Sequence, residues 1–482
     1  MLKKKNQVTI AKGDGIGPEI MEATLSILEK AKAPLAFEEI SIGKAVYERG
    51  VKTGIPDEAW NSINRTKTLL KAPITTPQGG GYKSLNVTIR KTLGLFANVR
   101  PCVSYAPYVD TKFPNMDLVI IRENEEDLYG GIEYRQSIDV MASLKLISRP
   151  GTERIVRYAF EYAKAQNRSK VTCMTKDNIM KLSDGLFHKI FDEIGEEYPE
   201  IEKNHMIIDI GAAKVAAAPH MFDVIVLPNL YGDIVSDIAA EITGSVGLGG
   251  SSNIGRNHAM FEAIHGSAPD IAGQGIANPS GLLLGSIMML VHLGLGKEAR
   301  LIHNAWLRTI EDGIHTADLY KDDHSIMKVG TTDFAKAVID NLGSEPRKLR
   351  PVSYASVKAG GIKIPPLKDP EPVEKELVGV DVAVTWEGKD PEILAELVQR
   401  DHVGNMELSI IANRGVKVWP AEKRNMAYAD NWRLRFKGKQ SVDRNDVLAL
   451  LKSLSDKGLD FTKAVNLHNF NGEPGYSLAQ GE

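Results

Sequence analysis

The stretch FDVIVLPNLYGDIVSD, residues 222–237, combines an apolar segment with the polar start of a helix. The part before Pro228 is apolar except for Asp223, which is expected of a strand whose two faces are both covered. The part after Pro228 carries Asp233 and Asp237 four residues apart, so in a helix both carboxylates lie on the same side. A strand that passes directly into a helix is the repeating unit of a parallel α/β sheet.

The same alternation of strand and helix recurs on both sides of this stretch. Strand-like segments of the same kind are VTIAK, AFEEIS, TLLKAP, MDLVIIRE, KVTCMTK and HMIIDIG, and helical patterns lie at 18–31, 56–64, 152–167 and 183–194. The alternation ends near Leu342. We therefore predict an α/β fold for this part of the chain.

The sequence changes character after Leu342. Residues 344–376 are rich in Pro, Lys and Glu without a hydrophobic period, which is typical of a linker. Residues 377–482 return to strand and helix patterns and predict a small α+β domain. Its last helix is expected to bury Val447, Leu450, Leu451 and Leu454 and to stop at Gly458.

Composition narrows the class of protein. The chain has 482 residues with a net charge of −3, so a strongly basic nucleic-acid-binding protein is not expected. Cys102 and Cys173 are its only cysteines, too few for a disulfide framework. The longest apolar run, 282–296, is interrupted by polar and glycine residues and is too short to span a bilayer. The basic N-terminus passes directly into a strand, without the apolar core of a signal peptide. We expect a cytoplasmic protein that binds neither membranes nor nucleic acid.

Two turns are candidates for binding a nucleotide. GDGIGPE, residues 13–19, has room for a phosphate or ribose, but it is not the GxGxxG fingerprint, so a conventional Rossmann site is unsupported; a plain strand-to-helix turn is the alternative. The loop HGSAPDIAGQGIANP, residues 265–279, contains Asp270, which can accept hydrogen bonds from a ribose diol. Here the alternative is a loop selected only for its turns.

Charged side chains suggest a site for an anion and a metal. Asp233 and Asp237 suit Mg²⁺ or Mn²⁺, and the alternative is a helix cap followed by a solvated aspartate. Residues 75–101 combine a glycine run with Ser84, Asn86, Arg90 and Arg100, and REN adds Arg122 shortly before Tyr129. Arginines that converge bind carboxylates in bidentate fashion, whereas arginines at this density also form surface ion pairs.

Taken together, these motifs resemble the β-decarboxylating dehydrogenases, the family of isocitrate, 3-isopropylmalate and homoisocitrate dehydrogenases. The resemblance runs over about residues 7–342 and includes NLYGDIVSDIAAEITGSVGLGGSSNIG, residues 229–255. It implies an isopropylmalate dehydrogenase-like body with a large cofactor-binding domain, 1–96 and 252–343, and a small domain, 97–251. The tail resembles that of longer bacterial isocitrate dehydrogenases, where the added domain contributes to subunit contacts.

The resemblance also implies the reaction. Ser84 and Asn86 stand where isocitrate dehydrogenases carry Ser and Asn, so isocitrate is the expected substrate. The implied substrate ligands are Ser84, Asn86, Arg90, Arg100 and Arg122, with Tyr129 and Lys176 as the acid/base pair. The implied metal ligands are Asp209, Asp233 and Asp237. Asp209 and Lys176 would come from the partner subunit, so a homodimer with shared sites is expected.

The implied cofactor site consists of Thr76, Glu262, His265, Gly266, Ala268, Asp270, Ile271 and Asn278. NADP-dependent relatives place Lys and Tyr where Asp270 and Ile271 stand, and Arg where Ala218 stands. A 2′-phosphate would meet a carboxylate here, so NAD is the expected cofactor. Two alternatives stay open: a homoisocitrate or other 2-hydroxyacid decarboxylating dehydrogenase, and a non-catalytic regulatory subunit.

Overall fold

The computed structural model describes residues 5–76, 84–354, 359–367, 372–400, 405–421 and 426–482. The chain divides into two compact units. The first consists of residues 1–129, 146–179 and 184–367, and the second of 130–145, 180–183 and 368–482. One ten-stranded sheet runs through the first unit, so its division into the large and small domains named above stays a prediction.

The sheet of the first unit is mostly parallel and reverses direction only near its middle. Its order is β2 (Leu35–Ile40), β1 (Asn6–Ala11), β3 (Thr68–Lys71), β12 (Ala259–Ala263), β11 (Gly250–Ile254), β4 (Ala97–Val103), β5 (Asp117–Glu123), β10 (Val224–Leu227), β8 (Lys170–Thr175) and β9 (Glu202–Ile207). β11 is antiparallel to β12 and β4, and β4 is antiparallel to β5. The expected α/β fold is confirmed.

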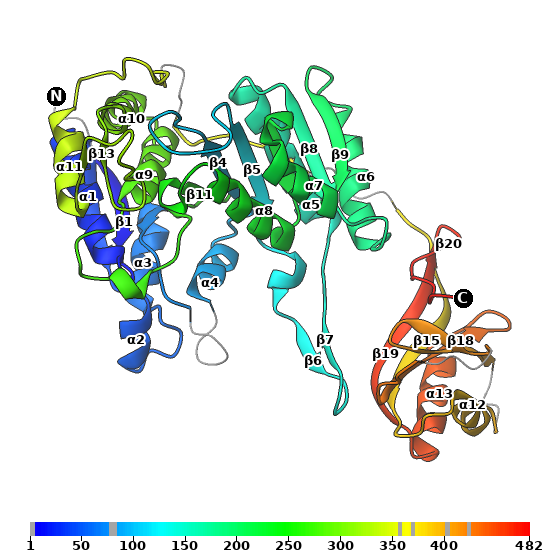
Figure 1. The fold of residues 1–482 in the computed structure, drawn as a ribbon. Coiled ribbons are helices and arrows are strands. Elements are labelled where there is room, and N and C mark those ends of the chain that lie inside the picture. Colours follow the sequence, from blue (N-terminus) through cyan, green and yellow to red (C-terminus); the bar gives the residue numbers. More distant parts are fainter. Residues whose placement is uncertain (1–4, 77–83, 355–358, 368–371, 401–404, 422–425) are drawn as a thin grey trace. The chain divides into compact units, whose positions relative to one another are not determined.

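One face of this sheet carries a continuous hydrophobic core. Alternate strand residues such as Val8, Val99 and Phe261 point into it, as the period of two in a strand requires. The helices that contribute to it are α1 (Gly17–Lys30), α5 (Arg149–Ala165), α6 (Ser183–Gly195), α9 (Ser280–His292), α10 (Gly296–Glu311) and α11 (Thr331–Asp340). In Figure 1, α1, α9, α10 and α11 lie around β1, and α5–α8 lie around β5, β8 and β9.

The opposite face is divided into two separate cores. One packs α3 (Asp57–Thr66) and α4 (Leu85–Thr92) on β1, β3 and β12, through residues such as Leu69 and Met260. The other packs α7 (Ile208–Ala217) and α8 (Asn229–Ile242) on β4, β5 and β10, through residues such as Ile120 and Val235. The strands between these helix pairs therefore lack a continuous apolar cover on this face.

The first unit also contains one short helix and a pair of two-residue strands outside its main sheet. They are α2 (Lys44–Glu48), β13 (Ile314–His315) and β14 (Met327–Lys328). Part of the segment predicted as a linker also packs on this unit: the backbone N–H groups of Arg347, Lys348 and Leu349 donate to Glu311, and Val352 exchanges hydrogen bonds with Asn304.

The second unit has an antiparallel sheet of six strands, in the order β17 (Val416–Trp419), β16 (Met406–Asn413), β18 (Asn431–Gly438), β15 (Lys375–Thr385), β19 (Asp460–Phe470) and β20 (Glu473–Pro474). Two helices, α12 (Pro391–Gln399) and α13 (Arg444–Asp456), share its core, so the tail is α+β as expected. α13 buries Val447, Leu450 and Leu454, whereas the fourth predicted residue, Leu451, is only partly buried. Gly458 follows the helix with a φ of 75°. The unit also includes a hairpin, β6 (Glu133–Arg135) and β7 (Met141–Ser143), where Ser137 contacts Asp430.

The apolar run 282–296 forms the buried helix α9 and the turn after it. None of the helices in the described part of the chain has the length and hydropathy needed to cross a membrane. α9 lies unusually close to β11 and β12, because a Cβ on Gly285 would come within 2.8 Å of the carbonyl oxygen of Glu262. The interior therefore requires a glycine here.

We predict that Gly285→Ala lowers the melting temperature by several degrees, because forcing a methyl group against rigid backbone costs about 1–3 kcal/mol. Gly185→Ala is the matched control. Gly185 is also helical, in α6, and nothing lies within 4 Å of the position that a Cβ would occupy there, so alanine should leave the melting temperature unchanged or raise it slightly. Equal melting temperatures for the two variants would contradict the close packing of α9.

Candidate active site

A polar cavity of about 210 Å³ opens on the sheet face between the two helix pairs. Its polar lining includes Lys71, Ser84, Asn86, Arg90, Arg100, Arg122, Tyr129, Asp233, Glu262 and His265. The structure thus brings all five predicted substrate ligands together with Tyr129 and Asp233. Residues 77–83, which hold the glycine run of that segment, lie outside the described residues.

Strands hold two of the arginines. Arg100 on β4 and Arg122 on β5 are 5% and 1% exposed. Both turn toward α8, where Arg122 Nη1 donates to Asp233 and Arg100 Nη1 lies 3.2 Å from Asp237 Oδ1. Asn229 at the start of α8 accepts two further bonds from Arg122, at 2.8 and 3.1 Å. The guanidinium groups are therefore fixed before any ligand arrives.

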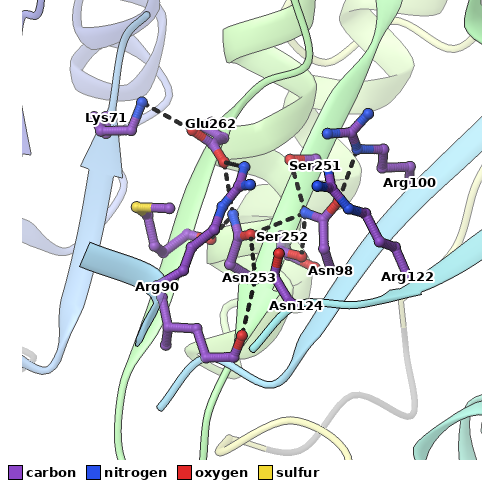
Figure 2. Close-up of polar contacts among 12 residues, drawn as sticks. Lys71, Arg90, Asn98, Arg100, Arg122, Asn124, Ser251, Ser252, Asn253 and Glu262 are labelled. Carbon is purple, nitrogen blue, oxygen red and sulfur yellow. Dashed lines mark hydrogen bonds and ion pairs between the residues drawn. The ribbon is translucent and has the colours of Figure 1, made fainter. Parts of the chain in front are cut away.

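Glu262 organises the other side of the cavity. Its carboxylate pairs with Lys71 Nζ and with Arg90 Nη2, each at 2.8 Å, and all three side chains are buried (Figure 2). Burial alone would raise the pKa of Glu262, but Lys71 and Arg90 hold it well below its usual value. Glu262 therefore stays ionised and serves as a counter-ion inside the protein.

Three buried polar atoms on the cavity wall have no hydrogen-bond partner among the described residues: Asn86 Oδ1, Arg90 Nε and His265 Nε2. Buried polar groups are nearly always paired, so unpaired ones gathered in a cavity suggest a ligand that pairs with them. Burial also lowers the pKa of His265, which keeps the ring neutral near pH 7.

The chemistry of α8 fits a divalent cation. Asp233 and Asp237 lie one turn apart on α8, as predicted, and their side chains are 32% and 66% exposed. Burial and the neighbouring Asp233 charge raise the pKa of Asp237 despite Arg100 nearby. A cation bound between the two carboxylates would relieve this repulsion.

Lys176 and Asp209 lie away from this cavity and do not line it. Lys176 follows β8, and its Nζ lies 2.9 Å from Asp209 Oδ1 at the start of α7. The Asp209 side chain is 67% exposed. The structure thus places these two residues beside each other but not beside Asp233.

Another group of potential metal ligands includes Asp177, the residue after Lys176. Asp177, His188 and His205 bring ligand atoms within 4.8 Å of one another. However, the two imidazole rings stack with their centroids 3.5 Å apart and 15° between their planes. Lone pairs in nearly parallel planes do not converge on one ion, so we assign no metal there.

The loop 265–279 is held by close backbone contacts. A Cβ on Gly15 would meet the carbonyl oxygen of Ser267 at 1.9 Å, and the N–H of Ile16 donates to that oxygen at 2.9 Å. The glycines of GDGIGPE therefore allow one loop to rest on another. Ala268 has a φ of 37°, a left-handed conformation that side chains rarely adopt.

Four of the other predicted cofactor residues lie in this loop, and Thr76 and Glu262 lie outside it. Gly266 lines the cavity beside His265. Asp270 and Ile271 form a short 3₁₀ turn in which Asp270 is exposed. Asn278 Nδ2 donates to Asp318 at 2.9 Å, and Thr76 donates to Ser84 at 3.5 Å. Glu262 is bonded to Lys71 and Arg90 and also lines the cavity.

Sequence reasoning missed Lys71 as well as Asn98, Asn124 and Asn253, which are buried beneath the cavity. A signal exists in hindsight: polar residues stand at alternate positions within an otherwise apolar strand in ANVRP, residues 97–101.

Known proteins resemble the chain over nearly its whole length. An isocitrate dehydrogenase [NADP] of Rickettsia bellii is 57% identical, covering 98% of this chain and 99% of the relative. An isocitrate dehydrogenase [NADP] of Thermus thermophilus is 42% identical, covering 98% and 96%. The crystal structure of the TT0538 protein from Thermus thermophilus superimposes with a TM-score of 0.91 at 41% identity, covering 99% and 96%.

These relatives overturn the prediction of NAD as cofactor, since those that match from end to end are named as NADP enzymes. The prediction of NAD rested on the residue types at Ala218, Asp270 and Ile271 alone. In the structure Asp270 is exposed, so water screens its charge. Its loop also rests on another element, because Thr331 N donates to Gly275 O at 2.8 Å.

Two family models cover the two parts of the chain. Residues 7–338 match isocitrate/isopropylmalate dehydrogenase, and residues 375–482 match the C-terminal domain of bacterial isocitrate dehydrogenase. The chain therefore belongs to the isocitrate/isopropylmalate dehydrogenase family and is of the longer bacterial type with a C-terminal domain.

Proposed function

We propose that the protein catalyses the metal-dependent oxidative decarboxylation of isocitrate to 2-oxoglutarate and CO₂, with NADP as hydride acceptor. The charge of the cavity carries this proposal. Four cationic side chains, Lys71, Arg90, Arg100 and Arg122, line the cavity with two carboxylates, Asp233 and Glu262. A third carboxylate, Asp237, lies outside the lining but pairs with Arg100 at 3.2 Å and is counted with them. The excess is one positive charge, and a divalent cation raises it to three. Isocitrate carries three carboxylates, so the bound complex is neutral.

The arginines orient the substrate in this proposal. Arg90, Arg100 and Arg122 would bind its carboxylates, with Ser84 and Asn86 at the distal one. Arg122 stays charged for this task, because burial and the neighbouring Arg100 lower its pKa only to about 10. Asp233 and Asp237 would hold Mg²⁺ or Mn²⁺, which supplies a Lewis acid when bound.

Tyr129 is positioned to deliver a proton. Its ring lies under the Arg122 guanidinium at 4.8 Å, and its hydroxyl donates to Asp233. Burial raises its pKa, so the phenol keeps its proton at neutral pH. Lys176 would take the substrate's hydroxyl proton from the side of a partner subunit, together with Asp209 as a third metal ligand.

In this proposal the protein is a homodimer, because Lys176 and Asp209 do not line the cavity of their own chain. Each site would then combine Tyr129 of one chain with Lys176 of the other. The two residues belong to different sites in a single subunit, which makes the arrangement testable by mixing variants.

The direct test of function is a matrix of substrates and cofactors. We expect the purified chain to oxidise isocitrate with NADP and Mn²⁺, to prefer NADP over NAD by at least about tenfold in kcat/KM, and to lose activity with chelator. Isopropylmalate and homoisocitrate should be poor substrates. An active chain that prefers homoisocitrate would overturn the substrate assignment. A folded chain inactive with every combination would indicate a regulatory subunit.

Asn86→Ala tests the distal carboxylate site. We expect KM for isocitrate to rise about 10- to 100-fold with kcat little changed, because a hydrogen bond to a charged group contributes about 1.5–3 kcal/mol. Asn61→Ala is the control, since Asn61 is exposed on α3. If both variants keep the wild-type KM, Asn86 does not bind substrate.

Mixing Tyr129→Phe and Lys176→Ala subunits tests the shared site. Each variant alone should be nearly inactive. Random reassociation should restore about one quarter of wild-type activity, because half of the dimers then contain one intact site out of two. Co-expression with separable tags gives the mixed dimer, and its inactivity would show that each site is built from a single chain.

A further inference from the structure

A row of buried polar side chains runs across the sheet beneath the cavity. Lys71, Glu262 and Ser251 are neighbours in the strand register, as are Asn253, Asn98 and Arg122. Residues directly opposite each other, and those two positions along, share one face of a sheet. All of these side chains therefore lie on the face that carries the cavity (Figure 2).

Two asparagines connect the two sides of this row. Arg100 Nε donates to Asn98 Oδ1 at 2.7 Å. Asn98 Nδ2 donates to Asn253 Oδ1 at 3.0 Å, and Asn253 Nδ2 donates to Glu262 Oε1 at 2.8 Å. That same Glu262 oxygen accepts from Arg90. A continuous hydrogen-bonded path thus joins Arg100 to Arg90 through the interior.

The direction of this path is fixed by its ends. Arg100 can only donate, and an ionised Glu262 can only accept. Each asparagine between them must then turn its oxygen toward Arg100 and its amide nitrogen toward Glu262. Hydrogen bonds aligned in one direction polarise and strengthen one another. Any residue that cannot donate at the Asn253 position therefore breaks the path.

Asn253 is the junction of the network. Its Oδ1 also accepts from Asn124 Nδ2 at 3.1 Å, and Asn124 in turn donates to the carbonyl oxygen of Leu95 at 2.9 Å. Asn98 and Asn253 are fully buried. Water cannot substitute for a lost partner at such a site without a structural change, so each bond constrains the geometry.

We propose that Asn253 and Asn98 are positioning residues that set the spacing between Arg90 and Arg100, and thereby the recognition of two carboxylates on one substrate. Neither asparagine lines the cavity; both act through the arginines and Glu262. The inference rests on the proposed function in one respect, namely that these arginines bind the substrate.

Asn253→Asp is the decisive variant because it changes one donor into an acceptor at nearly constant shape. The introduced carboxylate faces Glu262, and burial beside a like charge raises its pKa by several units. When protonated, it can donate to Glu262 as the amide did; when ionised, it repels Glu262 and displaces Arg90.

We expect KM for isocitrate in Asn253→Asp to approach the wild-type value near about pH 6 and to exceed it about 10- to 100-fold near about pH 9, with kcat changed much less. The wild-type enzyme measured at each pH corrects for the titration of other groups. Asn253→Ala lacks both donor and charge, so its KM should rise about tenfold at every pH.

Asn413→Asp is the matched control. Asn413 is a fully buried asparagine of the C-terminal unit whose amide donates to the carbonyl oxygens of Ala429 and Asn431. This substitution should lower the melting temperature without changing KM or its dependence on pH.

Binding is also measured without turnover, as the rise in melting temperature that isocitrate with Mn²⁺ produces. A wild-type protein that shows neither activity nor this rise counts against the proposed function. A responsive wild-type protein, combined with wild-type KM at all pH values in Asn253→Asp and Asn253→Ala, overturns the positioning role. The positioning role is supported if the KM of Asn253→Asp, divided by the wild-type KM at the same pH, rises with pH while the corresponding ratios for Asn253→Ala and Asn413→Asp do not.

Discussion

The Glu262 carboxylate is the interaction on which the cavity depends. It lies on a central strand and forms ion pairs with both Lys71 and Arg90, which are buried with it. An isolated charge of this depth costs several kcal/mol, so two cations could not stay there without it. One anion between two cations leaves a positive charge unmatched by that anion. The net positive charge of Lys71, Arg90 and Glu262 therefore favours an anionic ligand in the cavity.

The packing of helices exposes this charge on one side only. On the opposite face of the sheet, a single hydrophobic core formed with α1, α5, α6, α9, α10 and α11 excludes water from the strands. On the cavity face, the α3/α4 and α7/α8 pairs pack as two separate cores, and the polar row occupies the interval between them. Strands with both faces buried move little, which suits side chains that must bind a ligand with fixed geometry. Arg100 and Arg122 gain their rigidity from this position.

Much of this arrangement could be predicted from sequence. The alternating strands and helices, the paired carboxylates of α8 and the converging arginines each produce a local pattern or a recognisable motif. Lys71, Asn98 and Asn253 produce none, because their importance comes from strand order: β3, β12, β11 and β4 are neighbours in the sheet but lie far apart in the chain. The wrong prediction of NAD rested on the residue types at Ala218, Asp270 and Ile271, whereas the relatives that overturn it match nearly the whole chain.

Some side chains of the site are held rigidly in place, and others must exchange hydrogen-bond partners when a ligand binds. Arg122 and Arg100 are almost fully buried on strands, whereas the Asp233 side chain is about one-third exposed at the helix that faces them. Asp233 already accepts hydrogen bonds from Arg122, Arg100 and Tyr129. To hold a cation in the proposed reaction it must release arginines, and those arginines then need new anions. The carboxylates of the substrate supply them. Cation and substrate therefore each create the other's binding site, and by thermodynamic linkage each must strengthen the binding of the other by the same factor.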